Sequence, residues 1–75
     1  MYLETIEINT EYIKLDQLLK FSGIVESGAM AKQIILEGSV KVNDEVCLQR
    51  GKKIRPGNVI HIEDYGFLKV IEEEH

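Results

Sequence analysis

The feature that most constrains the fold is a change in hydrophobic spacing at Gly38. Before it, Ala31, Ile34 and Ile35 recur at the three- and four-residue spacing of one helix face. After it, the run "SVKVN" alternates apolar and polar residues, as a strand with one buried face does. A glycine just past a helix end readily adopts the left-handed conformation that closes the last turn. The chain must therefore combine helix and sheet.

Two helices are predicted, over residues 15–22 and 27–37. The first contains leucines at helical spacing and ends at Gly23. The second begins at Ser27, whose side-chain oxygen can accept from a free N–H group of the first turn. The core is expected to contain Leu18, Leu19, Ala31, Ile34, Ile35, Val40 and Val42.

The other regular segments are predicted strands joined by short turns. The strands cover residues 2–8, 39–42, 45–48, 59–63 and 67–71. Asn43–Asp44 and Pro56–Gly57 are turn-forming pairs, and short turns between consecutive strands impose antiparallel pairing. The predicted class is α+β: one domain over residues 1–75, with a two-helix hairpin packed on a small, mostly antiparallel β-sheet.

Composition argues against several other classes. The 75 residues contain one cysteine, Cys47, so no internal disulfide can form, and no Cys/His cluster has metal-ligand spacing. No apolar run approaches the ~18 residues that cross a bilayer, and the chain does not begin with a signal-peptide pattern. We expect a cytoplasmic protein without a membrane partner. No nucleophile–base set is recognisable, so we expect no enzyme activity, catalytic residue, cofactor or metal.

Positive charge is concentrated in the middle of this acidic chain. The net charge is −4, yet residues 14–55 carry +3, and the flanking segments carry −3 and −4. The run "RGKKIR", from Arg50 to Arg55, holds four of the nine basic residues. Guanidinium and ammonium groups bind phosphates well, although basic runs are often only solvated loops.

Aromatic side chains are few and scattered along the chain. The spread of Tyr2, Tyr12, Phe21, Tyr65 and Phe67 does not resemble an interleaved platform for stacking single strands. His61 is predicted to face outward from a strand, and we expect its removal to leave the fold nearly unchanged. Met30 is predicted to fill the core.

The stretch from Leu15 to Ile62 resembles the S-four RNA-binding domain, also called the alpha-L RNA-binding motif. The runs that carry the resemblance are "KLDQLL", "SG", "ESGAMAKQIILEGSVKVND" and "RPGNVI", which place the core motif at about residues 14–63. The chain is most similar to small stand-alone members, the YaaA-like group, whose "SGGEAK" and "RRGKK" runs resemble "SGAMAK" and "RGKK" here. Gly28 and Asp44 depart from the family, which usually has Arg and Gly at these positions.

The resemblance implies a non-catalytic RNA-binding module that recognises structured RNA, of the rRNA or tRNA class, through phosphates and shape. The ribosome or a ribosomal subunit is a further expected partner. The candidate RNA-binding residues, expected to converge on one face, are Lys14, Ser27, Lys32, Lys41, Arg50, Lys52, Lys53 and Arg55. The alternative is a protein-interaction domain on the same scaffold with weak or no RNA affinity, which Gly28 and the net negative charge favour.

Overall fold

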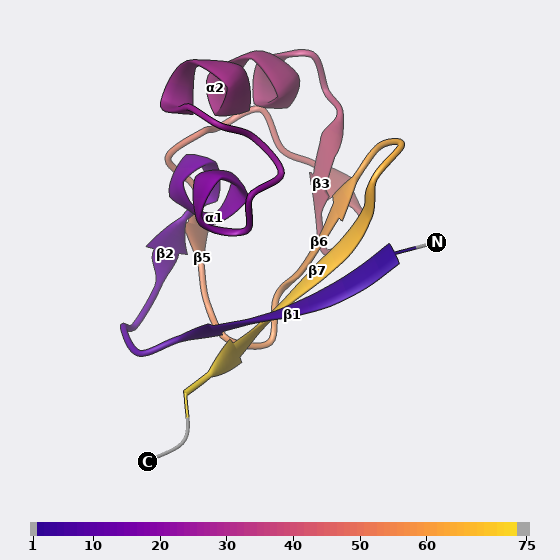
Figure 1. Cartoon of the computed structure of the whole chain (residues 1–75). Coiled ribbons are helices and arrows are strands. Elements are labelled where there is room, and N and C mark those ends of the chain that lie inside the picture. The colour runs from indigo at the N-terminus through magenta and orange to yellow at the C-terminus, as the bar shows by residue number, and fades with distance from the viewer. Residues whose placement is uncertain (1, 74–75) are drawn as a thin grey trace.

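The computed structural model describes residues 2–73, which form two short helices and seven strands (Figure 1). In chain order these are β1 (Tyr2–Ile8), β2 (Ile13–Lys14), α1 (Leu15–Phe21), α2 (Gly28–Leu36), β3 (Val40–Val42), β4 (Glu45–Val46), β5 (Lys53–Ile54), β6 (Val59–Ile62) and β7 (Gly66–Glu72). The α+β class and both predicted helices are confirmed. None of the helices in residues 2–73 has the length and apolar character needed to cross a membrane.

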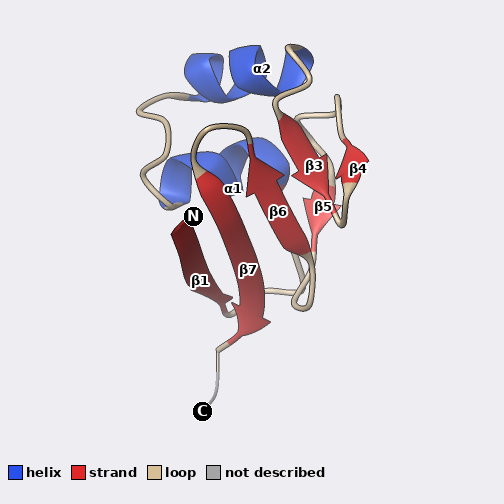
Figure 2. Ribbon diagram, turned by 90° about the vertical axis from the view of Figure 1, so that its right-hand side faces the viewer, coloured by secondary structure: helices blue, strands red, loops and turns tan. Residues whose placement is uncertain are grey.

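Five strands form the main sheet, in the order β1-β7-β6-β3-β4. The pairs β7–β6, β6–β3 and β3–β4 are antiparallel, as predicted, whereas β1 runs parallel to β7. A parallel pair needs a long connection, and here nearly the whole domain lies between the two strands. Figure 2 shows the five strands side by side, with α1 behind them and α2 above.

A second, two-stranded sheet pairs β2 with β5. The sequence reading missed this pair and treated residues 50–55 as a loop. It also extended the strand after Asp44 to residue 48, whereas β4 ends at Val46. The N–H of Cys47 still donates to the carbonyl of Val40 (2.9 Å), and beyond it the chain leaves the sheet and runs toward β5.

One hydrophobic core lies between the helices and the inner face of the main sheet. Six of the seven predicted core residues are buried, and Ile34 instead lies half-buried at the margin. Ile35 is one turn from buried Ala31, whereas Ile34 is rotated from Ile35 by about 100°. The same geometry turns Phe21 about 200° from Leu19, and Phe21 is 67% exposed. Met30, predicted as core, is also exposed.

Two turns have the backbone geometry that their residues predict. Asn43 and Asp44 both have positive φ, 49° and 70°, as in the type I′ turn of a two-residue hairpin. The side-chain oxygen of Asn43 also accepts from the N–H of Val59 (3.0 Å), which ties the hairpin to β6. At the second turn, Gly57 has φ of 100° after Pro56, the type II arrangement.

Candidate nucleic-acid interface

The basic run is held against the start of α1 by its own main chain. The N–H of Leu15 donates to the carbonyl of Lys52 (2.9 Å), and the N–H of Asp16 donates to the carbonyl of Arg50 (3.0 Å). The first N–H groups of a helix have no partner within the helix, and the N-cap residue Lys14 makes no side-chain cap hydrogen bond. The basic run therefore supplies the helix cap, while the side chains of Arg50, Lys52, Lys53 and Arg55 stay exposed.

The pairing of β2 with β5 brings Lys14 to the same place. Ile54 is fully buried, so the flanking Lys53 and Arg55 point outward. Lys14 lies directly opposite Lys53, and Ile13 lies opposite Ile54. Like charges at directly opposed positions destabilise a sheet. We call the exposed group Lys14, Arg50, Lys52, Lys53 and Arg55 the basic edge.

Tyr12 organises part of the basic edge and was not predicted as a site residue. The Nζ atom of Lys53 lies 5.0 Å from the centre of the Tyr12 ring, and the guanidinium carbon of Arg55 lies 5.7 Å from it. Cations over an aromatic face are attracted to its electron density. The ring therefore positions both cations. The only sequence signal for Tyr12 is its place two residues before Lys14. This signal is weak, because Lys53 and Arg55 are distant from Tyr12 in the chain.

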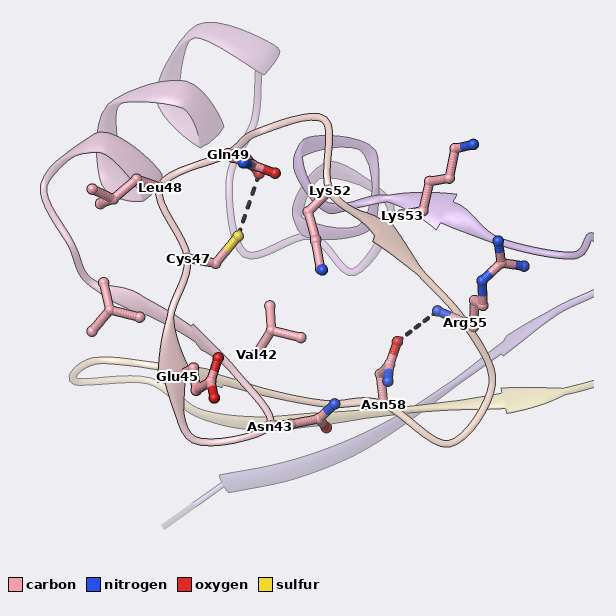
Figure 3. A pocket seen from close by; sticks show the side chains of 11 residues that line it. Val42, Asn43, Glu45, Cys47, Leu48, Gln49, Lys52, Lys53, Arg55 and Asn58 are labelled. Carbon is pink, nitrogen blue, oxygen red and sulfur yellow. Dashed lines mark hydrogen bonds between the residues drawn. The ribbon is translucent and has the colours of Figure 1, made fainter.

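A hollow of about 710 Å³ lies between the β3–β4 hairpin and the basic edge. Figure 3 shows the Lys52 side chain pointing into it, with Lys53 and Arg55 along one side. The side-chain oxygens of Asn43 and Asn58 accept from the N–H groups of Val59 (3.0 Å) and Arg55 (2.7 Å). Each amide NH2 group is thus left to donate to a ligand. The hollow offers several donors and a single acidic side chain, that of Glu45.

The remaining predicted residues lie on other elements. Ser27 caps α2, where its Oγ accepts from the N–H of Met30 (3.2 Å), and Lys32 is exposed on the same helix. Lys41 is exposed on β3 between buried Val40 and Val42, so it points to the sheet face opposite the helices. The expected convergence on one face therefore does not include Lys41, because side chains alternate between the two faces of a strand.

The charge of the basic edge is not neutralised within residues 2–73. No acidic side chain in that range forms an ion pair with any of its five cations. The same range contains no group of three or more His, Cys, Asp or Glu side chains arranged to hold a metal ion. The arrangement is suited to an anionic partner that spans several cations, with polar donors beside them in the hollow.

The helix hairpin on a mostly antiparallel sheet and the basic edge beside it define a small domain of known type. A family model of the S4 domain matches residues 6–71, and the chain belongs to this family, the S-four domain that its motifs resemble. A curated relative is the "Probable ribosome maturation protein RlbA" of Bacillus subtilis (strain 168), which is 44% identical over 66 residues, 88% of this chain and 93% of that protein.

A solved structure agrees with this assignment. The solution structure of YbcJ from E. coli, described as revealing an alfaL motif involved in RNA-binding, matches with a TM-score of 0.69 and 34% sequence identity. The match covers 89% of this chain and 85% of YbcJ. The family and the fold predicted from the sequence are both confirmed.

Proposed function

We propose that this chain is a non-catalytic RNA-binding module whose basic edge holds the phosphate backbone of structured RNA. The observation that carries the proposal is that Lys53 and Arg55 lie over the Tyr12 ring, with Lys14 directly opposite Lys53. Such a cluster of like charges opposes folding, and a polyanion offsets that repulsion. The chain as a whole has a net charge of −4, so a generally basic composition does not account for this cluster of cations.

The names of the similar proteins support a more specific target. One relative is called a probable ribosome maturation protein, and the matching solved structure is described through an RNA-binding motif. We therefore propose that the module acts in the cytoplasm, on ribosomal RNA or on a ribosomal subunit during its maturation. Transfer RNA, which shares the same helical geometry, is the other substrate class that fits.

The proposed recognition depends on phosphates and on shape. A-form RNA has a deep, narrow groove whose base edges side chains cannot reach, so proteins read its backbone and geometry. Arg50 and Arg55 supply planar forks for phosphate oxygens, and the lysines act as point charges. The acidic terminal segments repel polyanions from the parts of the surface that they cover.

The test is a salt titration of binding to one folded rRNA fragment. The parent protein is compared with the Lys52→Ala/Lys53→Ala double variant and with Lys20→Ala, a control at an exposed position of α1. Each phosphate contact releases counterions, so the double variant should flatten the slope of log K against log salt by roughly two units. Lys20→Ala should leave the slope unchanged.

Equal slopes for the parent and the double variant would contradict the proposal. The basic edge would then be a solvated surface, and a protein-interaction domain on the same scaffold would become the better explanation. A uniform loss of affinity in the double variant across unrelated folded RNAs would support recognition of phosphates over recognition of bases.

A further inference from the structure

The face of the main sheet opposite the helices carries an aromatic pair that the proposed function leaves unused. Strand register aligns a row of outward side chains across all five strands. From β1 to β4 the row is Leu3, Phe67, His61, Lys41 and Val46. Figure 2 views this face, which we call the outer sheet face, and no helix lies in front of it.

His61 and Phe67 form a stacked pair at the centre of the row. Their ring centroids are 4.5 Å apart, their planes differ by 29°, and both side chains are only half-buried. Residues 61 and 67 are separated by a turn, and only the antiparallel pairing of β6 with β7 places them side by side.

Lysines flank the two rings. Lys41 is the direct cross-strand neighbour of His61, and neighbouring strands lie about 4.8 Å apart. Lys69 follows Phe67 by two positions, so it points to the same face, and both lysines are exposed. At the outward positions of the described strands the acidic residue is Glu7, which pairs with Ile71 beyond Lys69. The rings are therefore flanked by two lysines and, two positions after His61, by the exposed carboxylate of Glu63.

We propose that the outer sheet face is a second RNA contact, where an unpaired nucleobase stacks on the His61–Phe67 pair and Lys41 and Lys69 hold the neighbouring phosphates. This inference rests on the proposed function. Aromatic rings on an open sheet stack bases from single strands, and cations beside them bind the connecting backbone. A dry protein interface would have to desolvate both ammonium groups, which is costly without a partner for each.

The two RNA contacts are continuous around one edge of the sheet. Val46 ends the row on β4 and also lines the hollow into which Lys52 points. A structured RNA held on the basic edge can thus extend an adjoining unpaired strand around the β3–β4 hairpin. Lys41, which the fold separates from the basic edge, gains a role at this second contact.

The test uses two probes, a single-stranded oligoadenylate of about six nucleotides and a blunt RNA duplex of about 12 base pairs. The His61→Ala/Phe67→Leu variant removes both rings and keeps an apolar side chain at residue 67. It should bind the oligoadenylate roughly 5- to 100-fold more weakly than the parent and bind the duplex within about twofold of the parent. Lys52→Ala/Lys53→Ala is the matched control and should chiefly weaken duplex binding.

A second measurement uses the parent protein alone, so the inference can still be tested if the ring variant does not fold. Adding the oligoadenylate should shift the NMR signals of the His61 and Phe67 ring protons, and adding the duplex should not. Unchanged ring signals, or equal oligoadenylate affinity of the parent and the ring variant, would overturn the inference. So would a ring variant that only loses self-association in sedimentation, since the face would then join two copies of the chain.

These outcomes separate the two proposals. Suppose that oligoadenylate binding depends on the two rings, while the salt slope does not change in the Lys52→Ala/Lys53→Ala variant. This result would refute RNA binding by the basic edge and support RNA binding by the outer sheet face. The reverse pattern would retain the proposed function and remove the second contact.

Discussion

Ile54 is the residue whose truncation best tests how the basic edge is held in place. It lies between Lys53 and Arg55 in β5, opposite Ile13, and its side chain is fully buried. Replacing it with alanine leaves the charges untouched and removes the apolar anchor beneath them. Ile54→Ala should therefore cost stability as a core truncation does.

The magnitude follows from the complete burial of the side chain. Truncating a buried isoleucine to alanine costs about 2–5 kcal/mol, through lost transfer free energy and the cavity that remains. A loss of about 3 kcal/mol is a large share of the 5–15 kcal/mol typical of a domain. For a domain of this size it lowers the melting temperature by roughly 12–24 °C.

The assay is urea unfolding followed by circular dichroism, with Ile34→Ala as the matched control. Ile34 undergoes the same change of side chain but is only half-buried, so its truncation should cost about 1–2 kcal/mol. With a slope of about 1–3 kcal/mol per molar urea, the two variants should unfold at clearly separated midpoints.

Two results would refute this reasoning. A loss below about 1 kcal/mol for Ile54→Ala would mean that residues 50–55 form a solvated loop, and that the carbonyls of Arg50 and Lys52 do not cap α1. Equal losses of unfolding free energy for Ile54→Ala and Ile34→Ala would mean that α2 buries Ile34 as fully as the core buries Ile54.

Two further substitutions test the hairpin and the aromatic support of the basic edge. Asp44→Gly should stabilise the fold by up to about 1 kcal/mol in the same urea assay, because Asp44 has φ of 70° and glycine adopts that conformation without strain; a loss of stability would contradict the type I′ turn. Tyr12→Leu keeps the apolar bulk but removes the ring beneath Lys53 and Arg55, so it should weaken binding to the folded rRNA fragment by about two- to fivefold with little change in salt slope. Unchanged affinity would show that the ring does not position the two cations.

Much of the local structure could be predicted because its causes are local. The spacing of apolar residues around Ala31 and Ile35 predicts α2, and Ser27 and Gly38 mark its two ends. The Asn43–Asp44 pair predicts a tight hairpin because both residue types tolerate positive φ. The motifs between Leu15 and Ile62 also led to the correct family.

The missed features depend on segments that meet only after folding. Strands of two residues, such as β2 and β5, are too short to show the period of two by which strands are recognised. Their pairing decides that Lys14 faces Lys53 and that Tyr12 lies beneath two cations. No pattern in the sequence around residue 12 contains that information.

By itself, the sequence determined both helices, five of the seven strands to within about two residues at each end, the positions of two turns, and the concentration of positive charge between residues 14 and 55. Only the tertiary structure decided that β1 adds in parallel beside β7, that Lys41 leaves the basic edge for the outer sheet face, and that His61 stacks on Phe67. The physical reason is that periodicity, caps and turns act between neighbours in the chain. Strand order and register are instead set by which distant apolar faces can be buried together in one core.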